Sequence, residues 1–152
     1  MPDPTQGLTQ SFTMTDPTIL YPLLALVTWT FVMWVWLYVT RIPAIQKANV
    51  DMEELRQTGS PLVLPADVSR VADNYNHLHE QPTLFYALTL AAAVMGIADP
   101  ISAGIAWLYV VIRIVHSLIQ ATKNVIFVRF CVFALASVVL FSFLLRIIYL
   151  SL

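Results

Sequence analysis

The side chains that could carry chemistry gather first in residues 73–80, which run without a loop into an apolar segment. On a helix at 100° per residue, four of these polar side chains share one face, with Arg70 beside it: Asp73, Asn76, His77 and Glu80. Ionisable groups inside a membrane are costly unless they are paired, hydrated or liganded. A spanning helix that carries several of them is therefore a candidate functional site.

A second polar face follows in residues 101–122, where a helix would align Arg113, His116, Ser117, Gln120 and Asn124. Counted along antiparallel helices, Glu80 and Arg113 both lie about 14–15 Å from the same membrane surface. An ion pair between them is the least costly way to hold either charge in the bilayer. The alternative is that this pair is only a structural pin between the two helices.

Polar side chains from both faces are expected to line a cavity that opens to the cytoplasm, with Arg41, Arg70 and Arg129 at its mouth. His77 and His116 would sit at similar depths, about 10 and 9 Å. Such a site suits a small anionic ligand and an apolar co-substrate from the lipid. Two other interpretations stay open: the two histidines could ligate haem or a metal, although no metal site is predicted, and Arg129 could be only a cytoplasmic anchor.

The composition is that of a membrane protein. Of the 152 residues 59% are hydrophobic and 11% are charged, whereas average soluble domains carry about 25% charged residues. The net charge of −1 gives no indication of a nucleic-acid partner, and a single cysteine excludes an intrachain disulfide. We expect one all-α domain, a four-transmembrane-helix bundle in the lipid bilayer, with spans at about 20–39, 68–97, 101–122 and 125–149 after a polar tail of residues 1–16.

Prolines and basic residues organise these spans. Pro43 is expected to end the first helix, a short amphipathic helix is possible around residues 50–57, and Pro82 should kink the second span. Six of the eight Lys and Arg residues fall on one side: Arg41, Lys47, Arg56, Arg70, Lys123 and Arg129. The positive-inside rule therefore predicts that both termini are on the non-cytoplasmic side.

Several motifs resemble the MAPEG family, the membrane-associated proteins of eicosanoid and glutathione metabolism. The resemblance covers about residues 20–148 and is that of a divergent member. The matching residues are Arg70, Asn76 or His77, Glu80 with the aromatic-rich segment 82–86, Arg113-x-x-His116, and Arg129. The resemblance implies a homotrimer, with glutathione as co-substrate in a U shape at the subunit interface.

Carried over to this chain, the family pattern gives roles to individual residues. Arg41 would reach a glutathione carboxylate in the neighbouring subunit, Glu80 would take the amino group or pair with Arg113, and Arg129 would be the catalytic cation that favours the thiolate. The ligand-binding set is then Arg41, Arg70, Asn76, His77, Glu80, Arg113, His116 and Gln120.

The chain also departs from the family pattern. His77 stands where the family usually has Asn, Gln120 where it has Tyr, and Phe130 leaves no hydroxyl beside Arg129. The first hypothesis is a glutathione-dependent transferase or peroxidase acting on a lipophilic electrophile. The alternative, which Gln120 and Phe130 favour, is a non-catalytic lipid-binding protein or an accessory subunit of a larger membrane complex.

Overall fold

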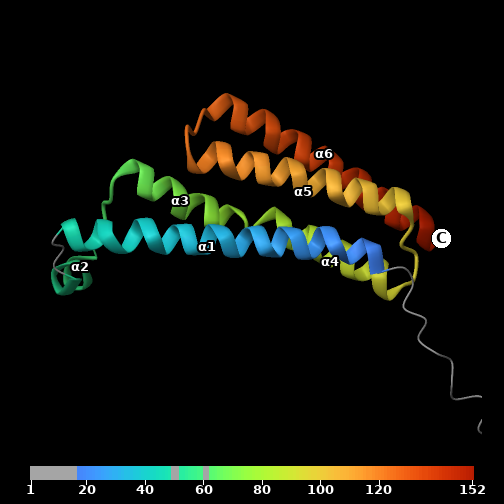
Figure 1. The fold of residues 1–152 in the computed structure, drawn as a ribbon, viewed down its shortest axis with the longest axis horizontal. Coiled ribbons are helices and arrows are strands. Elements are labelled where there is room, and N and C mark those ends of the chain that lie inside the picture. The colour runs from blue at the N-terminus through green and yellow to red at the C-terminus, as the bar shows by residue number, and fades with distance from the viewer. Residues whose placement is uncertain (1–16, 49–51, 60–61) are drawn as a thin grey trace, which may run out of the picture.

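Long apolar segments joined by short polar turns fold into a bundle of α-helices (Figure 1). The computed structural model describes residues 17–48, 52–59 and 62–152. A short 3-10 helix, Pro17–Ile19, is followed by α1 (Leu20–Ala48), α2 (Met52–Thr58), α3 (Ala66–His77), α4 (Gln81–Val94), α5 (Pro100–Ala121) and α6 (Ile126–Ser151). The polar tail expected at residues 1–16 and the start of the short helix expected at residue 50 lie outside the described residues.

Within the described residues, α1, α5 and α6 are each long and apolar enough to cross a membrane. The fourth crossing is made by α3 and α4, which follow one another along α1, while α5 and α6 form a second layer (Figure 1). Large apolar side chains such as Phe31, Leu90 and Val138 are exposed on the outside of the bundle, where lipid is their natural solvent. The protein is thus a four-helix membrane bundle, as the sequence predicts.

The second span is broken rather than merely kinked, which corrects the expectation of one continuous helix. The α-helix stops at His77, and residues 78–80 form a turn before α4 begins at Gln81. Pro82 in the first turn of α4 has no N–H to donate to the carbonyl of Leu78, and its ring clashes with that carbonyl in a straight helix. The chain therefore leaves the helix for one turn beside the polar cluster.

The first helix does not end before Pro43, so that prediction is wrong. Helix α1 runs through Pro43 to Ala48. The proline removes the hydrogen bond to the carbonyl of Val39. Val39 lies near the end of the span, where water can hydrate the carbonyl that Pro43 leaves free, so the lost bond costs little there.

Helix α5 is the central element, because it packs against α1, α3 and α6. Its buried face changes character along its length. Ala106, Tyr109 and Val110 belong to the apolar core, in which Tyr109 stacks on Phe85 with ring centroids 4.7 Å apart. One to three turns later the same face carries buried polar side chains: Arg113, His116, Ser117 and Gln120.

The opposite end of α5 is fixed by a capping aspartate. Asp99 accepts a hydrogen bond from the backbone N–H of Ser102 (2.8 Å) and forms an ion pair with Arg146 of α6. The Arg146 guanidinium holds the pKa of the Asp99 carboxyl at about 2. This contact ties α6 to the α4–α5 turn, away from the polar cluster.

Candidate functional site

A cavity of about 250 Å³ lies between the end of α3, the second half of α5 and the first half of α6. Its lining combines polar and aromatic side chains: His77, His116, Gln120, Ile126, Arg129, Phe130 and Phe133. The structure therefore brings together four of the residues selected from the sequence, namely His77, His116, Gln120 and Arg129.

Arg113 lies beside this cavity and is fully buried. Its Nη2 donates to the backbone carbonyl of His77 (3.1 Å), so the guanidinium caps the end of α3 where the helix breaks. Its Cζ lies 6.0 Å from the centroid of the Phe133 ring. No ion pair between Arg113 and a carboxylate is present in the described part of the chain.

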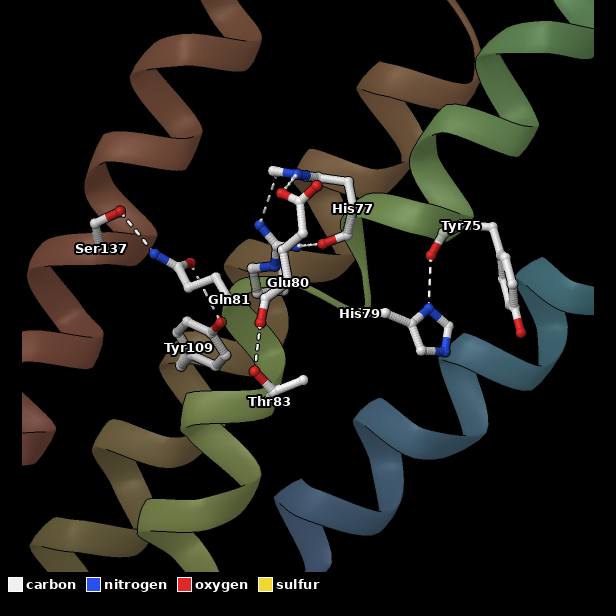
Figure 2. A network of polar contacts seen from close by, with 9 residues as sticks. Tyr75, His77, His79, Glu80, Gln81, Thr83, Tyr109 and Ser137 are labelled. Atoms are coloured by element: carbon white, nitrogen blue, oxygen red, sulfur yellow. Dashed lines mark hydrogen bonds and ion pairs between the residues drawn. The ribbon is translucent and has the colours of Figure 1, made fainter.

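The predicted Glu80–Arg113 ion pair is thus wrong. Glu80 instead pairs with His77, with Oε2 and Nδ1 2.7 Å apart (Figure 2). Equal depth along two straight helices placed Glu80 opposite Arg113, but the break before Gln81 turns the Glu80 side chain outward, where it is 66% exposed.

The two contacts of the His77 ring define its tautomer. Arg113 Nη1 lies 3.5 Å from His77 Nε2, and a guanidinium can only donate hydrogen bonds. Nε2 is therefore the unprotonated nitrogen, and the Nδ1–H donates to the Glu80 carboxylate. His77 joins an exposed carboxylate to a buried cavity.

Two other cavity residues carry polar atoms without partners. His116 Nδ1 and Gln120 Oε1 are buried and have no hydrogen-bond partner within the described residues. The His116 ring lies 5.1 Å from that of His77 and 5.9 Å from that of Phe133, measured between centroids. Buried polar atoms are usually satisfied, so these atoms indicate a place for water or for a ligand that forms hydrogen bonds with them.

The Arg129 guanidinium makes one contact with the α5–α6 turn and also borders the cavity. Its Nη1 donates to Asn124 Oδ1 (2.8 Å), and Asn124 adopts a left-handed conformation (φ 50°) in the α5–α6 turn. Since Arg129 also lines the cavity, its guanidinium can contact the turn and a ligand at once.

The remaining predicted site residues do not line this cavity. Arg41 is half-buried on α1, Arg70 is half-buried on α3 with its Nε unpartnered among the described residues, and Asn76 is exposed. Glu80 reaches the cavity only through His77. The polar face predicted for residues 73–80 therefore points outward except at His77, because α3 turns its apolar side chains toward α1 and α5.

Asn74 is the residue that the sequence analysis missed. It is fully buried and donates to Ser117 Oγ (2.7 Å), which also accepts from Trp29 Nε1 (3.0 Å). Asn74 lies in an i, i+3, i+7 row with Val71 and Leu78, both buried, and that spacing was the available signal. The contact joins α1, α3 and α5 next to the cavity, because Ser117 directly follows His116 and Asn74 lies about one turn before His77.

A second polar contact fastens the chain after the break. Gln81 Nε2 donates to Ser137 Oγ of α6 (2.8 Å), and the Tyr109 hydroxyl donates to Gln81 Oε1 (3.3 Å), as Figure 2 shows.

Within the described residues no group of three or more His, Cys, Asp and Glu could hold a metal ion.

Four membrane-crossing segments, with a cavity that bears a cationic side chain between α3, α5 and α6, define a multi-pass integral membrane protein with an internal polar site. The sequence profile of the MAPEG family matches residues 19–149, so the chain belongs to the MAPEG family. This confirms the resemblance noted from the sequence. No curated protein and no solved structure matched the chain.

Proposed function

We propose that the protein binds glutathione in the cavity between α3, α5 and α6 and acts as a glutathione-dependent transferase or peroxidase on lipophilic electrophiles. The observation that carries the proposal is the convergence of His77, His116, Gln120 and Arg129 on one cavity beside the buried Arg113. Membership of the MAPEG family supports glutathione as the co-substrate.

The charges around the cavity favour an anionic ligand. Arg113 is buried without a carboxylate partner in the described residues, and an uncompensated buried cation is costly. Arg129 adds a second cation to the lining. An anion in the cavity would offset both, and glutathione brings two carboxylates and a thiol that can ionise.

The other residues that line the cavity suit the polar groups of glutathione and an apolar electrophile. His116 Nδ1 and Gln120 Oε1 could accept hydrogen bonds from the amide or ammonium groups of glutathione. Ile126, Phe130 and Phe133 give the cavity an apolar wall on α6, and Phe130 is exposed toward the bilayer. An apolar electrophile could reach the thiol from that side.

The active form is proposed to be a homotrimer. Arg41 stands on α1, outside the cavity lining of its own chain. In the family arrangement it would reach the neighbouring subunit's cavity and hold a glutathione carboxylate. Arg41→Gln expressed alone should then weaken binding, and coexpression with Arg129→Gln chains should restore some binding sites; a site built within one chain would bind normally in Arg41→Gln alone.

The membrane orientation is also a proposal. The basic connections after α1 and α5 would face the cytoplasm, with both termini on the other side. The cavity then opens toward the compartment that holds a reduced glutathione pool.

Calorimetric titration of the purified protein with glutathione tests the proposal. We expect binding in the millimolar range or below that weakens as salt rises, because charges near the cavity mouth are screened. Arg129→Gln should weaken binding about tenfold or more, since hydrogen bonds to charged groups contribute about 1.5–3 kcal/mol. Lys123→Gln removes an exposed cation from the same turn and should change little.

Asn124→Gly separates the two contacts of Arg129. It removes the 2.8 Å hydrogen bond to the turn, leaves the guanidinium available for a ligand, and tolerates the positive φ of this position, which alanine does not. If Asn124→Gly reproduces the whole loss seen in Arg129→Gln, then Arg129 acts through the turn and not on the ligand.

The apolar wall of the cavity favours one other function, a non-catalytic lipid-binding or accessory role. Ile126, Phe130 and Phe133 would accept an acyl chain as readily as an electrophile. Absence of glutathione binding at millimolar concentration, in both detergent and nanodiscs, would leave this function as the better one.

A further inference from the structure

The contact between His77 and Glu80 has the geometry of a carboxylate-backed general base. The carboxylate accepts from the Nδ1–H at 2.7 Å and fixes the ring orientation, which leaves Nε2 unprotonated. The ring itself lines the cavity, whereas the Glu80 side chain is 66% exposed. A base is therefore held between the buried cavity and the outside.

We infer that His77, positioned by Glu80, is the general base that takes the proton from a thiol bound in this cavity. The inference rests on the proposed function for the identity of the thiol. His77 stands where the family usually has Asn, so the inference gives a chemical role to a residue in which this chain differs from its family. Deprotonation by His77 needs no hydroxyl group at Gln120 or Phe130.

The proton transfer is balanced within the site. The S–H bond breaks, an N–H bond forms at His77 Nε2 in place of the 3.5 Å contact from Arg113 Nη1, and the electron pair stays on sulfur. The imidazolium is then paired with the Glu80 carboxylate, while the thiolate lies near the guanidinium groups of Arg113 and Arg129. Once the thiolate has attacked its electrophile, His77 Nε2 gives the proton to the leaving group or to the adduct, and the ring returns to the tautomer that carries its proton on Nδ1.

The charged groups around His77 favour its protonation only when a thiolate lies beside it. Glu80 faces Nδ1 from the turn, Arg113 and His116 face the ring from α5, and Arg129 approaches from α6. The two arginines by themselves oppose a third positive charge, on His77. A thiolate placed among them reverses that balance, so proton transfer and anion binding support each other.

The experiment follows the ultraviolet absorbance of the bound thiolate against pH in the full-length protein. His77→Asn is the main variant, because it keeps a polar side chain and leaves the backbone carbonyl that Arg113 contacts. We expect His77→Asn to move thiolate formation to higher pH and to slow conjugation of a model electrophile on the order of 100-fold near neutral pH, within the range of general-base catalysis. The rate should recover as pH rises.

Glu80→Gln tests the positioning residue. It should give a smaller shift of the thiolate titration in the same direction, and Glu80→Asp should restore part of it. If the Glu80 carboxylate only stabilises the helix break, Glu80→Gln will leave the pH profile unchanged.

Binding of S-methylglutathione, which has no thiol proton, separates this inference from the proposed function. Glu80→Gln, whose side chain lies outside the cavity lining, should bind it as the wild-type protein does, and His77→Asn should still bind it, which shows that both variants fold. Intact binding with an unchanged thiolate titration in His77→Asn would overturn the general base alone. A wild-type protein that binds neither compound would overturn the proposed function and this inference with it.

Discussion

Replacing Glu80 with alanine tests the pairing scheme at the helix break. The Glu80 carboxylate is 66% exposed and its partner His77 is 21% exposed. Exposed ion pairs contribute about 0–1 kcal/mol, whereas breaking a buried pair costs about 3–5 kcal/mol. Because Glu80 pairs with His77 and not with the buried Arg113, Glu80→Ala should lower the free energy of unfolding by about 1 kcal/mol or less.

The free energy of unfolding is measured by titrating the protein in mixed micelles with a denaturing detergent and following tryptophan fluorescence. The control is Glu53→Ala, which breaks an exposed pair of the same i, i+3 spacing between Glu53 and Arg56 (2.7 Å). The two variants should lose similar amounts. A loss of about 3–5 kcal/mol in Glu80→Ala alone would show that this carboxylate compensates the buried guanidinium, and would refute the scheme.

Three further predictions concern the rest of the bundle. Arg113→Met should change stability little, because removal of an uncompensated buried cation offsets loss of the hydrogen bond to the His77 carbonyl, yet weaken glutathione binding more than about tenfold; a destabilised variant with normal affinity would contradict this. Asp99→Ala should lower the free energy of unfolding by about 1–2 kcal/mol through the lost helix cap and ion pair. Because Arg146 depresses the pKa of Asp99 to about 2, the stability that the pair contributes is complete above the ordinary carboxyl value, and thermal melting should show it decline as pH falls from about 4 toward 2. In a cysteine-free background, an impermeant reagent should label Lys123→Cys only from the cytoplasmic side and Leu152→Cys only from the other side; the reverse pattern would reject the proposed orientation.

The sequence predicted what depends on helical periodicity. The α5 side chains Arg113, His116 and Gln120 were expected on one face, and all are buried on that face. This worked because α5 is unbroken between Pro100 and Ala121, so a rotation of 100° per residue holds throughout.

The same reasoning gave wrong results where the backbone departs from a helix. The turn at residues 78–80 moves the Glu80 side chain away from Arg113. A constant rotation of 100° per residue does not predict such a break in the helix. Residue type also gave a wrong result in α3. Asn74 and Asn76 have the same side chain, but only Asn74 lies on the buried face of α3 and contacts Ser117. The decision between them depends on tertiary packing.

A density map of the protein with bound glutathione, determined by electron cryomicroscopy in nanodiscs, tests the central claim most directly. We expect density for the tripeptide in the cavity between α3, α5 and α6, with a carboxylate or the thiol at Arg129 and the thiol within hydrogen-bonding reach of His77. Density for an acyl chain in that cavity, or for glutathione at another place, would contradict the account.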